Sequence, residues 1–128
     1  MTLLLDTHTI LWFFWDDPKL STVAKVAIEE PANKKVVRVA SCWELAIKAS
    51  LGKVTLGEPS SSFLAREIAR NNFDLLPINL DHATAVETLA FHHCDPFDRM
   101  LITQSLLEQM PIVSADPQFD LYGLIRVW

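Results

Sequence analysis

Four acidic side chains are the strongest candidates for chemistry in this chain. Asp6 and Asp116 each follow a predicted strand, and Glu44 and Asp98 each lie in the first turn of a predicted helix. Carboxylates that meet repel one another unless a cation compensates their charge. Mg²⁺ and Mn²⁺ prefer oxygen ligands, and such a metal neutralises phosphate and activates water. The four acids therefore predict a divalent metal site suited to phosphoryl transfer.

Each acid also has a purely structural interpretation. The segment 41–44 fits a capping box, in which Glu44 only hydrogen-bonds the backbone at the N-cap. Asp98 could stabilise the positive end of its helix, and Asp116 could cap a short turn. Asp6 is harder to explain in this way, because a carboxylate directly after a buried strand is costly to desolvate without a partner. Only the joint placement of the four acids favours catalysis.

Strands alternate with helices along the whole chain. We predict strands at 3–5, 36–39, 75–78, 112–114 and 125–128, and helices at 8–15, 21–30, 41–50, 63–71, 82–92 and 96–109. This alternation predicts an α/β fold with a central, mostly parallel sheet and helices on both faces. Ligands of such sheets bind beyond the carboxyl ends of the strands, which is where the four acids would meet.

Capping signals refine this pattern. Asp95 is the expected N-cap of the helix that Pro96 opens, because proline suits the first helical position. This leaves Asp98 as the inward-facing ligand. Asp81 is the expected cap of the preceding helix. The strand at 75–78 contains a proline, and we therefore place it near an edge of the sheet.

Composition limits the class of protein. The chain has 128 residues, of which half are hydrophobic and 21% are charged, and its net charge is −5. These values exclude a disordered chain and predict a single domain over residues 1–128. A protein whose whole surface attracts nucleic acid is normally basic. Binding of RNA or DNA would therefore depend on a bound cation or a local basic patch.

Lys48 and Arg99 are the main candidates for contacts to an RNA backbone. Further basic candidates are Lys34, Lys35, Arg38 and Lys53. Lys48 has an alternative role as the partner of Glu44, four residues before it on the same helix. For any of these residues a solvated surface charge is the common alternative.

Other features bear on the compartment of the protein. No apolar run approaches the ~20 residues that span a bilayer, and the N-terminus has no basic region with a cleavage site, so we expect no signal peptide. Two cysteines, Cys42 and Cys94, are too few for a disulfide framework. The pair His92-His93 beside Cys94 lacks the second ligand cluster of a structural zinc site, so we interpret it as helix-end residues. We expect a cytoplasmic protein with reduced thiols.

Four short motifs follow one another along nearly the whole chain. They are Leu3-Leu4-Leu5-Asp6-Thr7-His8, Ser41-Cys42-Trp43-Glu44, Asp95-Pro96-Phe97-Asp98-Arg99-Met100-Leu101-Ile102 and Ile112-Val113-Ser114-Ala115-Asp116. This ordered set resembles the PIN domain, and most closely the VapC-type ribonuclease toxins of bacterial toxin–antitoxin pairs.

The resemblance implies a three-layer α/β/α fold and a Mg²⁺-dependent (or Mn²⁺-dependent) endoribonuclease. Asp6, Glu44 and Asp98 match the three core metal-binding acids of the family, and Asp116 matches its more variable fourth acid. Ser114 matches a small hydroxyl residue that orients a water or a carboxylate. The resemblance further implies an RNA substrate, a homodimer and a cognate antitoxin protein as partner.

Two alternatives stay open at this stage. The first is a non-catalytic PIN-like module that binds RNA or protein without cutting, although all four acids are present. The second is a haloacid-dehalogenase-like phosphatase, which needs a second Asp two residues after the first. This chain has His8 at that position, where many PIN relatives carry Ser or Asn, so the role of His8 stays open.

Overall fold

All neighbouring strands of the central sheet run parallel, in the order β3-β2-β1-β4-β5. A computed structural model describes the whole chain, residues 1–128. Its strands are β1 (Thr2–Leu5), β2 (Lys34–Arg38), β3 (Asp74–Leu76), β4 (Ile112–Val113) and β5 (Arg126–Val127). β3 ends just before Pro77 and lies at an edge, so both the parallel sheet and its predicted edge strand are confirmed.

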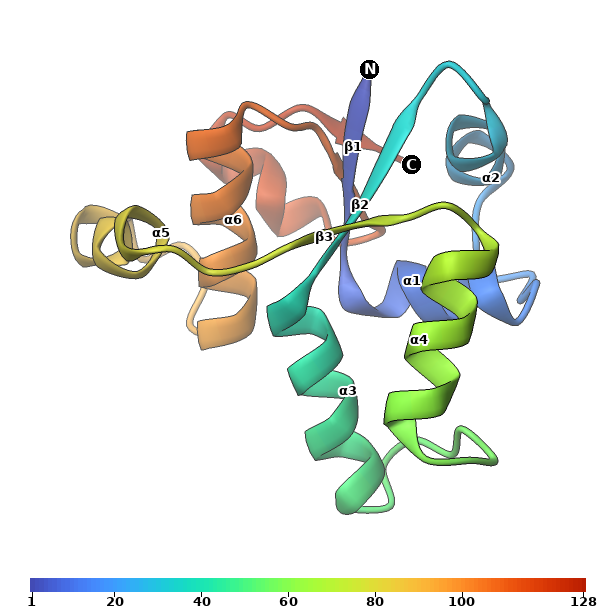
Figure 1. Cartoon of the computed structure of the whole chain (residues 1–128). Helices are drawn as coiled ribbons and strands as arrows, with labels where there is room; N and C mark the ends of the chain where they lie inside the picture. The colour runs from blue at the N-terminus through green and yellow to red at the C-terminus, as the bar shows by residue number, and fades with distance from the viewer.

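Helices cover both faces of the sheet, which gives three layers (Figure 1). They are α1 (Thr7–Phe14), α2 (Thr22–Glu29), α3 (Val39–Ser50), α4 (Ser60–Arg70), α5 (Leu80–Ala85) and α6 (Pro96–Glu108), with the 3₁₀ helices η1 (Val86–Thr88) and η2 (Pro117–Tyr122). None of the helices has the length and apolar character needed to cross a membrane.

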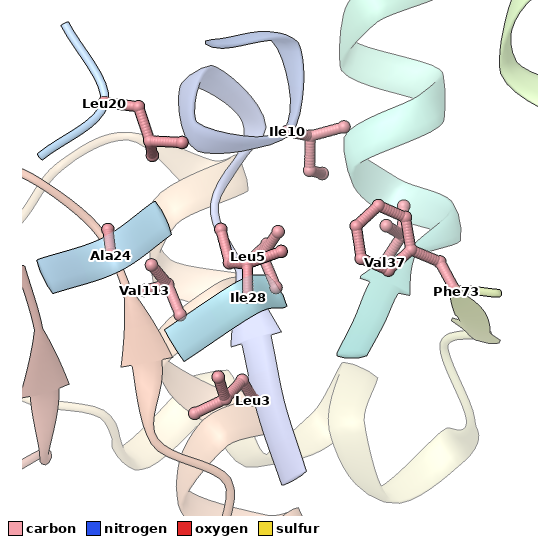
Figure 2. Packing of buried hydrophobic residues seen from close by; sticks show 9 residues of the cluster. All are labelled: Leu3, Leu5, Ile10, Leu20, Ala24, Ile28, Val37, Phe73 and Val113. Carbon is pink, nitrogen blue, oxygen red and sulfur yellow. The ribbon is translucent and has the colours of Figure 1, made fainter. Parts of the chain in front are cut away.

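One hydrophobic core lies between the sheet and the helices α1 and α2. Figure 2 shows Leu3 and Leu5 of β1 with Val113 of β4, close to Ile10 of α1 and Ile28 of α2. All five side chains are fully buried. Burial of each such side chain stabilises the fold by about 1.5–3 kcal/mol before the entropy of ordering is subtracted.

A second core lies on the opposite face of the sheet. Successive side chains of a strand point to opposite faces, so Leu4 points away from its two neighbours and packs beneath α6. Its fully buried partners are Ile112 of β4, Leu101 and Ile102 of α6, and Phe119 of η2. The apolar run in β1 is thus explained by burial on both faces, as expected for a central parallel strand.

α3 extends beyond the carboxyl end of β2 and lies beside α4 (Figure 1). Leu45 of α3 packs with Phe63 and Leu64 of α4 and with Leu11 of α1. This third cluster holds α3 in place next to the end of β1, where Asp6 follows the strand.

The predicted start of α3 at Ser41 is wrong. The helix begins at Val39, and Arg38 is its N-cap residue. The extended backbone of β2 passes directly into the helix, with no loop between them. Glu44 therefore lies beyond the first turn and is not part of a capping box, which removes its structural interpretation as a cap.

The predicted helix 82–92 is too long, and its cap is a different residue. α5 is capped by Asn79 and not by Asp81. Asn79 accepts a hydrogen bond from the backbone of His82, whose ring nitrogen accepts one from the backbone of Asn79. This reciprocal pair starts the helix earlier than expected, and the segment between η1 and α6 is irregular.

Candidate metal centre

The carboxyl ends of β1 and β4 lie side by side in the middle of the sheet. After β1 the chain proceeds outward through β2 to β3, and it then returns to β4 on the other side of β1. Ligands of open α/β sheets bind beyond the strand ends at such a reversal of strand order. Asp6 directly follows β1, and Asp116 lies three residues after β4. Both predicted acids therefore lie beyond the carboxyl ends of these two central strands.

The start of α6 brings Asp98 together with Asp116 and His93. His93 Nε2 lies 3.1 Å from Asp98 Oδ2 and 3.3 Å from Asp116 Oδ2. Asp98 is held there because Asp95 caps the helix, accepting from the backbone N–H of Phe97 at 2.8 Å and of Asp98 at 3.2 Å. The prediction that Asp95 is the N-cap is confirmed.

Asp6 and Arg38 end neighbouring parallel strands. Leu4 is in register with Val36, and the backbone stays extended for two further residues on each strand. Because strand side chains alternate, Asp6 and Arg38 lie on the face of the sheet that α6 covers. Asp6 Oδ1 accepts from the backbone N–H of Thr9 at 2.7 Å and so caps α1.

Glu44 reaches the same region from α3. The hydroxyl of Thr7, next to Asp6, donates to Glu44 Oε1 at 2.7 Å and lies 3.0 Å from Ser41 Oγ. Glu44 Oε2 forms an ion pair with Lys48 at 2.9 Å. These contacts join the end of β1 to α3 and orient the carboxylate of Glu44.

Arg38 is a buried cation among these acids. Its side chain is fully buried, its Nη1 donates to the carbonyl of Phe97 at 3.0 Å, and its Nε has no partner. Burial lowers the pKa of Arg38 to about 10, and the charges of Glu44, Asp98 and Asp6 oppose that shift. Since this pKa is well above neutral, Arg38 stays positively charged beside the acids.

The pKa of Asp98 responds both to burial and to the other acids. Burial raises the pKa of Asp98 to about 6, and the charges of Asp95, Glu44 and Asp6 add to the increase, whereas His93 opposes it. Carboxylates that are distant in sequence therefore act on one another at one site. Oxygen donors with excess negative charge fit a hard divalent cation.

The structural and chemical interpretations of Asp116 are compatible. Asp116 Oδ1 accepts from the backbone N–H of Gln118 at 2.9 Å, which caps η2, whereas Oδ2 faces His93. Ser114 is fully buried, and its hydroxyl accepts from the backbone N–H of Asp116 at 3.1 Å. Ser114 thus orients the backbone of Asp116 directly and its carboxylate only indirectly.

The predicted RNA contact at Arg99 is wrong. The side chain is buried, and both terminal guanidinium nitrogens donate within the protein at 2.9–3.2 Å. The four acceptors are the carbonyls of Val86, Leu89, Ala90 and His93. Arg99 therefore fastens the irregular segment before α6 to that helix and has no terminal group directed toward a ligand.

Arg38 and Lys48, two further basic candidates, differ in their burial. Arg38 is buried and cannot contact RNA at the surface. Lys48 is half-buried and pairs with Glu44, the alternative raised for it from the sequence. Its contact to an RNA backbone stays a prediction.

Sequence reasoning missed the roles of His93, Arg38 and Thr7 at the site, although Arg38 was among the basic candidates for RNA contact. His93 is not a helix-end residue, since it lies in the segment between η1 and α6. Its spacing of five residues before Asp98 gives no helical or strand signal, so only the fold reveals their contact. Arg38 is a charge that ends an apolar strand, as Asp6 nearly does, and that signal indicates a place at the site and not an RNA contact at the surface.

Comparisons with known proteins agree with this fold. The PIN domain family model matches residues 3–124. Among solved structures, VapBC2 from Rickettsia felis bound to a promoter DNA fragment matches with a TM-score of 0.73 and 14% identity, covering 98% of this chain and 97% of that chain. VapBC-1 from nontypeable Haemophilus influenzae matches with a TM-score of 0.69 and 14% identity, covering 98% of this chain and 96% of that chain.

FitAcB from Neisseria gonorrhoeae matches with a TM-score of 0.62 and 14% identity, covering 97% of this chain and 95% of that chain. At this identity the three structures establish a common fold and nothing finer. None of the curated proteins matches the chain.

Proposed function

This chain belongs to the PIN domain family, and from that premise we propose that it is a Mg²⁺-dependent endoribonuclease that acts as the toxin of a toxin–antitoxin pair. The observation that carries the proposal is the convergence of acids that are distant in sequence: His93 Nε2 lies 3.1 Å from Asp98 and 3.3 Å from Asp116, and Thr7, next to Asp6, donates to Glu44. Burial and, after it, the charges of Asp95, Glu44 and Asp6 raise the pKa of Asp98 to about 6, so these acids also act on one another electrostatically. A site of this kind favours binding of a divalent cation over binding of a neutral or anionic ligand alone.

Asp6, Glu44, Asp98 and Asp116 would hold the cation, Mg²⁺ or Mn²⁺. When bound, it would supply charge neutralisation for the scissile phosphate and lower the pKa of a water. The role of the chain is to keep the oxygens in place: Thr7 orients Glu44, and Asp95 fixes the turn that carries Asp98. No protein side chain needs to act as the nucleophile.

Replacement of Asp6 by asparagine tests the mechanism. Asn caps helices about as well as Asp does, so α1 and the fold should persist while a metal-binding oxygen is lost. We expect wild-type protein to cut a mixed RNA substrate with Mg²⁺ and to stop in excess EDTA, and Asp6→Asn to lose at least about a hundredfold in rate. The matched control is Asp81→Asn, which changes an exposed acid of α5.

The same assay separates the alternatives. RNA that is bound but never cut in Mg²⁺ would favour a non-catalytic module. Undiminished cleavage by Asp6→Asn, or in EDTA, would overturn the metal mechanism. A single-stranded DNA of the same base sequence serves to test the proposed preference for RNA. The phosphatase alternative has lost its basis, because the matching family is the PIN domain.

We also propose the partners implied by this function. The VapBC and FitAcB structures, to which the fold is similar, are toxin–antitoxin assemblies, and we infer a cognate antitoxin for this chain. A homodimer and a cytoplasmic location belong to the same proposal. Twice the 14.5 kDa mass of the chain in sedimentation would support the homodimer.

A further inference from the structure

His93 is held more firmly than a surface histidine needs to be. Its backbone N–H donates to the hydroxyl of Tyr122 at 2.9 Å, and its carbonyl accepts from Arg99 at 3.2 Å. Its ring stacks on the buried ring of Phe119, with centroids 5.8 Å apart and planes 20° apart. Backbone and ring plane are therefore both fixed by neighbours that play no part in the proposed chemistry.

The hydrogen bond at the other ring nitrogen determines what Nε2 does. The backbone N–H of Asp95 donates to His93 Nδ1 at 3.3 Å. A ring that accepts at Nδ1 carries its proton on Nε2. His93 Nε2 then donates toward the Oδ2 atoms of Asp98 and Asp116, at 3.1 and 3.3 Å.

We propose that His93 is a positioning residue of the cation site, which holds the carboxylates of Asp98 and Asp116 together by donating from Nε2. The two acids come from α6 and from the start of η2, and no hydrogen bond joins them directly. His93 spans them. A donor of this kind orients metal ligands without binding the metal itself. This inference rests on the proposed metal-dependent function.

Two substitutions of His93 separate the effect of its hydrogen-bond donor from the effect of its aromatic ring. His93→Phe keeps a ring to stack on Phe119 but has no donor, and His93→Gln places an amide donor near the position of Nε2 but has no ring. By calorimetry with Mg²⁺ alone, we expect His93→Phe to weaken binding at least about tenfold, as loss of a group that orients metal ligands does. We expect His93→Gln to bind within about threefold of wild type, since its amide still donates.

The result that would overturn the proposal is equal weakening in both variants, or Mg²⁺ binding by His93→Phe that matches wild type. A second measurement applies even if His93→Phe fails to fold. In wild-type protein loaded with Mn²⁺, pulsed electron paramagnetic resonance should show no directly bonded imidazole nitrogen. A directly bonded nitrogen that is present in wild type and absent in His93→Gln would make His93 a ligand and contradict the donor role.

These outcomes are distinct from failure of the proposed function. If wild-type protein neither binds Mg²⁺ nor cuts RNA, the nuclease proposal fails. If wild-type protein does both and the variants do not differ in Mg²⁺ affinity, only the role of His93 fails. Thermal unfolding in EDTA supplies the fold control for each variant.

Discussion

In this protein one carboxylate can use one oxygen to cap a helix and direct the other oxygen to the candidate metal site. Asp6 and Asp116 each use Oδ1 to accept a backbone N–H at the start of a helix. Asp116 directs its second oxygen to His93. Because an amide oxygen also accepts such a bond, Asn substitutions remove charge and spare the cap. This is why Asn, and not Ala, is the informative replacement at these positions.

Asp98→Asn should stabilise the metal-free protein near neutral pH. The pKa of Asp98 is raised from 3.8 to about 6, so ionisation is less favourable in the folded state than in the unfolded chain. Its stabilising contribution is complete below pH 3.8 and is lost as the pH rises through 6. Such a shift in pKa corresponds to about 3 kcal/mol in the free energy of unfolding. Because the side chain is partly exposed, solvent screening reduces this effect to about 1 kcal/mol.

Thermal unfolding in EDTA at several pH values measures this effect. The variant should exceed wild type in Tm by about 4 °C at pH 7.5, and the difference should decrease toward pH 5. RNA cleavage by the same variant should be lost, so stability and activity would change in opposite directions. A variant less stable than wild type at pH 7.5, with no trend in pH, would contradict the argument.

At the scale of elements, the start of α6 organises one side of the site. Asp95 caps the helix through two backbone N–H groups, and Pro96 occupies the first helical position. The helix in turn places the carboxylate of Asp98 beside the ring of His93, and Arg99 against the backbone of the segment that carries His93. The short stretch 95–99 therefore supplies the helix cap, the proposed ligand Asp98 and the anchor Arg99. Arg99 holds the segment of His93, the residue that contacts both Asp98 and Asp116.

Asp95→Ala and Asp95→Ser isolate the contribution of the cap. Both variants remove the charge of Asp95, but only serine keeps an oxygen that accepts the two N–H bonds. We expect Asp95→Ala to be less stable than Asp95→Ser by about 1 kcal/mol in urea unfolding. Asp95→Ser should retain RNA cleavage, in contrast to Asp98→Asn. Loss of cleavage in Asp95→Ser would mean that Asp95, and not only Asp98, acts at the site.

At the scale of the whole molecule, the net charge is acidic and repels RNA. An RNA substrate would therefore have to be attracted locally, by a bound cation or a basic patch. The chain carries a net charge of −5, and two of its basic side chains, Arg38 and Arg99, are buried. The nine other basic side chains are outnumbered by 16 acidic ones, so long-range forces do not attract a polyanion to the molecule as a whole. We therefore expect the proposed cation to supply the attraction for phosphate.

Cation binding should stabilise the whole fold, because the four proposed ligands come from four separate parts of the chain. A ligand at ten times its Kd adds about 1.4 kcal/mol to folding, which corresponds to a rise in Tm of about 5 °C for a chain of this size. We expect this rise with Mg²⁺ in wild-type protein, measured against Na⁺ at equal ionic strength. An equal rise in Asp98→Asn would show that Mg²⁺ binds somewhere else.

The sequence by itself determined the order of the elements, the parallel sheet and the ends at which the acids lie. These properties follow from local signals: apolar runs, β-branched segments, and the Asp95-Pro96 start of α6. Capping at Ser41 and Asp81 was mispredicted, because the direct passage from β2 into α3 and the pair Asn79–His82 compete with those local preferences.

Only the tertiary structure decided which polar side chains meet. Whether Arg99 faces a ligand or a carbonyl depends on where the segment before α6 lies, and that segment has no periodic signal. The same is true of His93, which contacts Asp116 across 23 residues of sequence. Contacts of this kind arise from the packing of separate elements, and the local propensities that predict those elements contain no information about them.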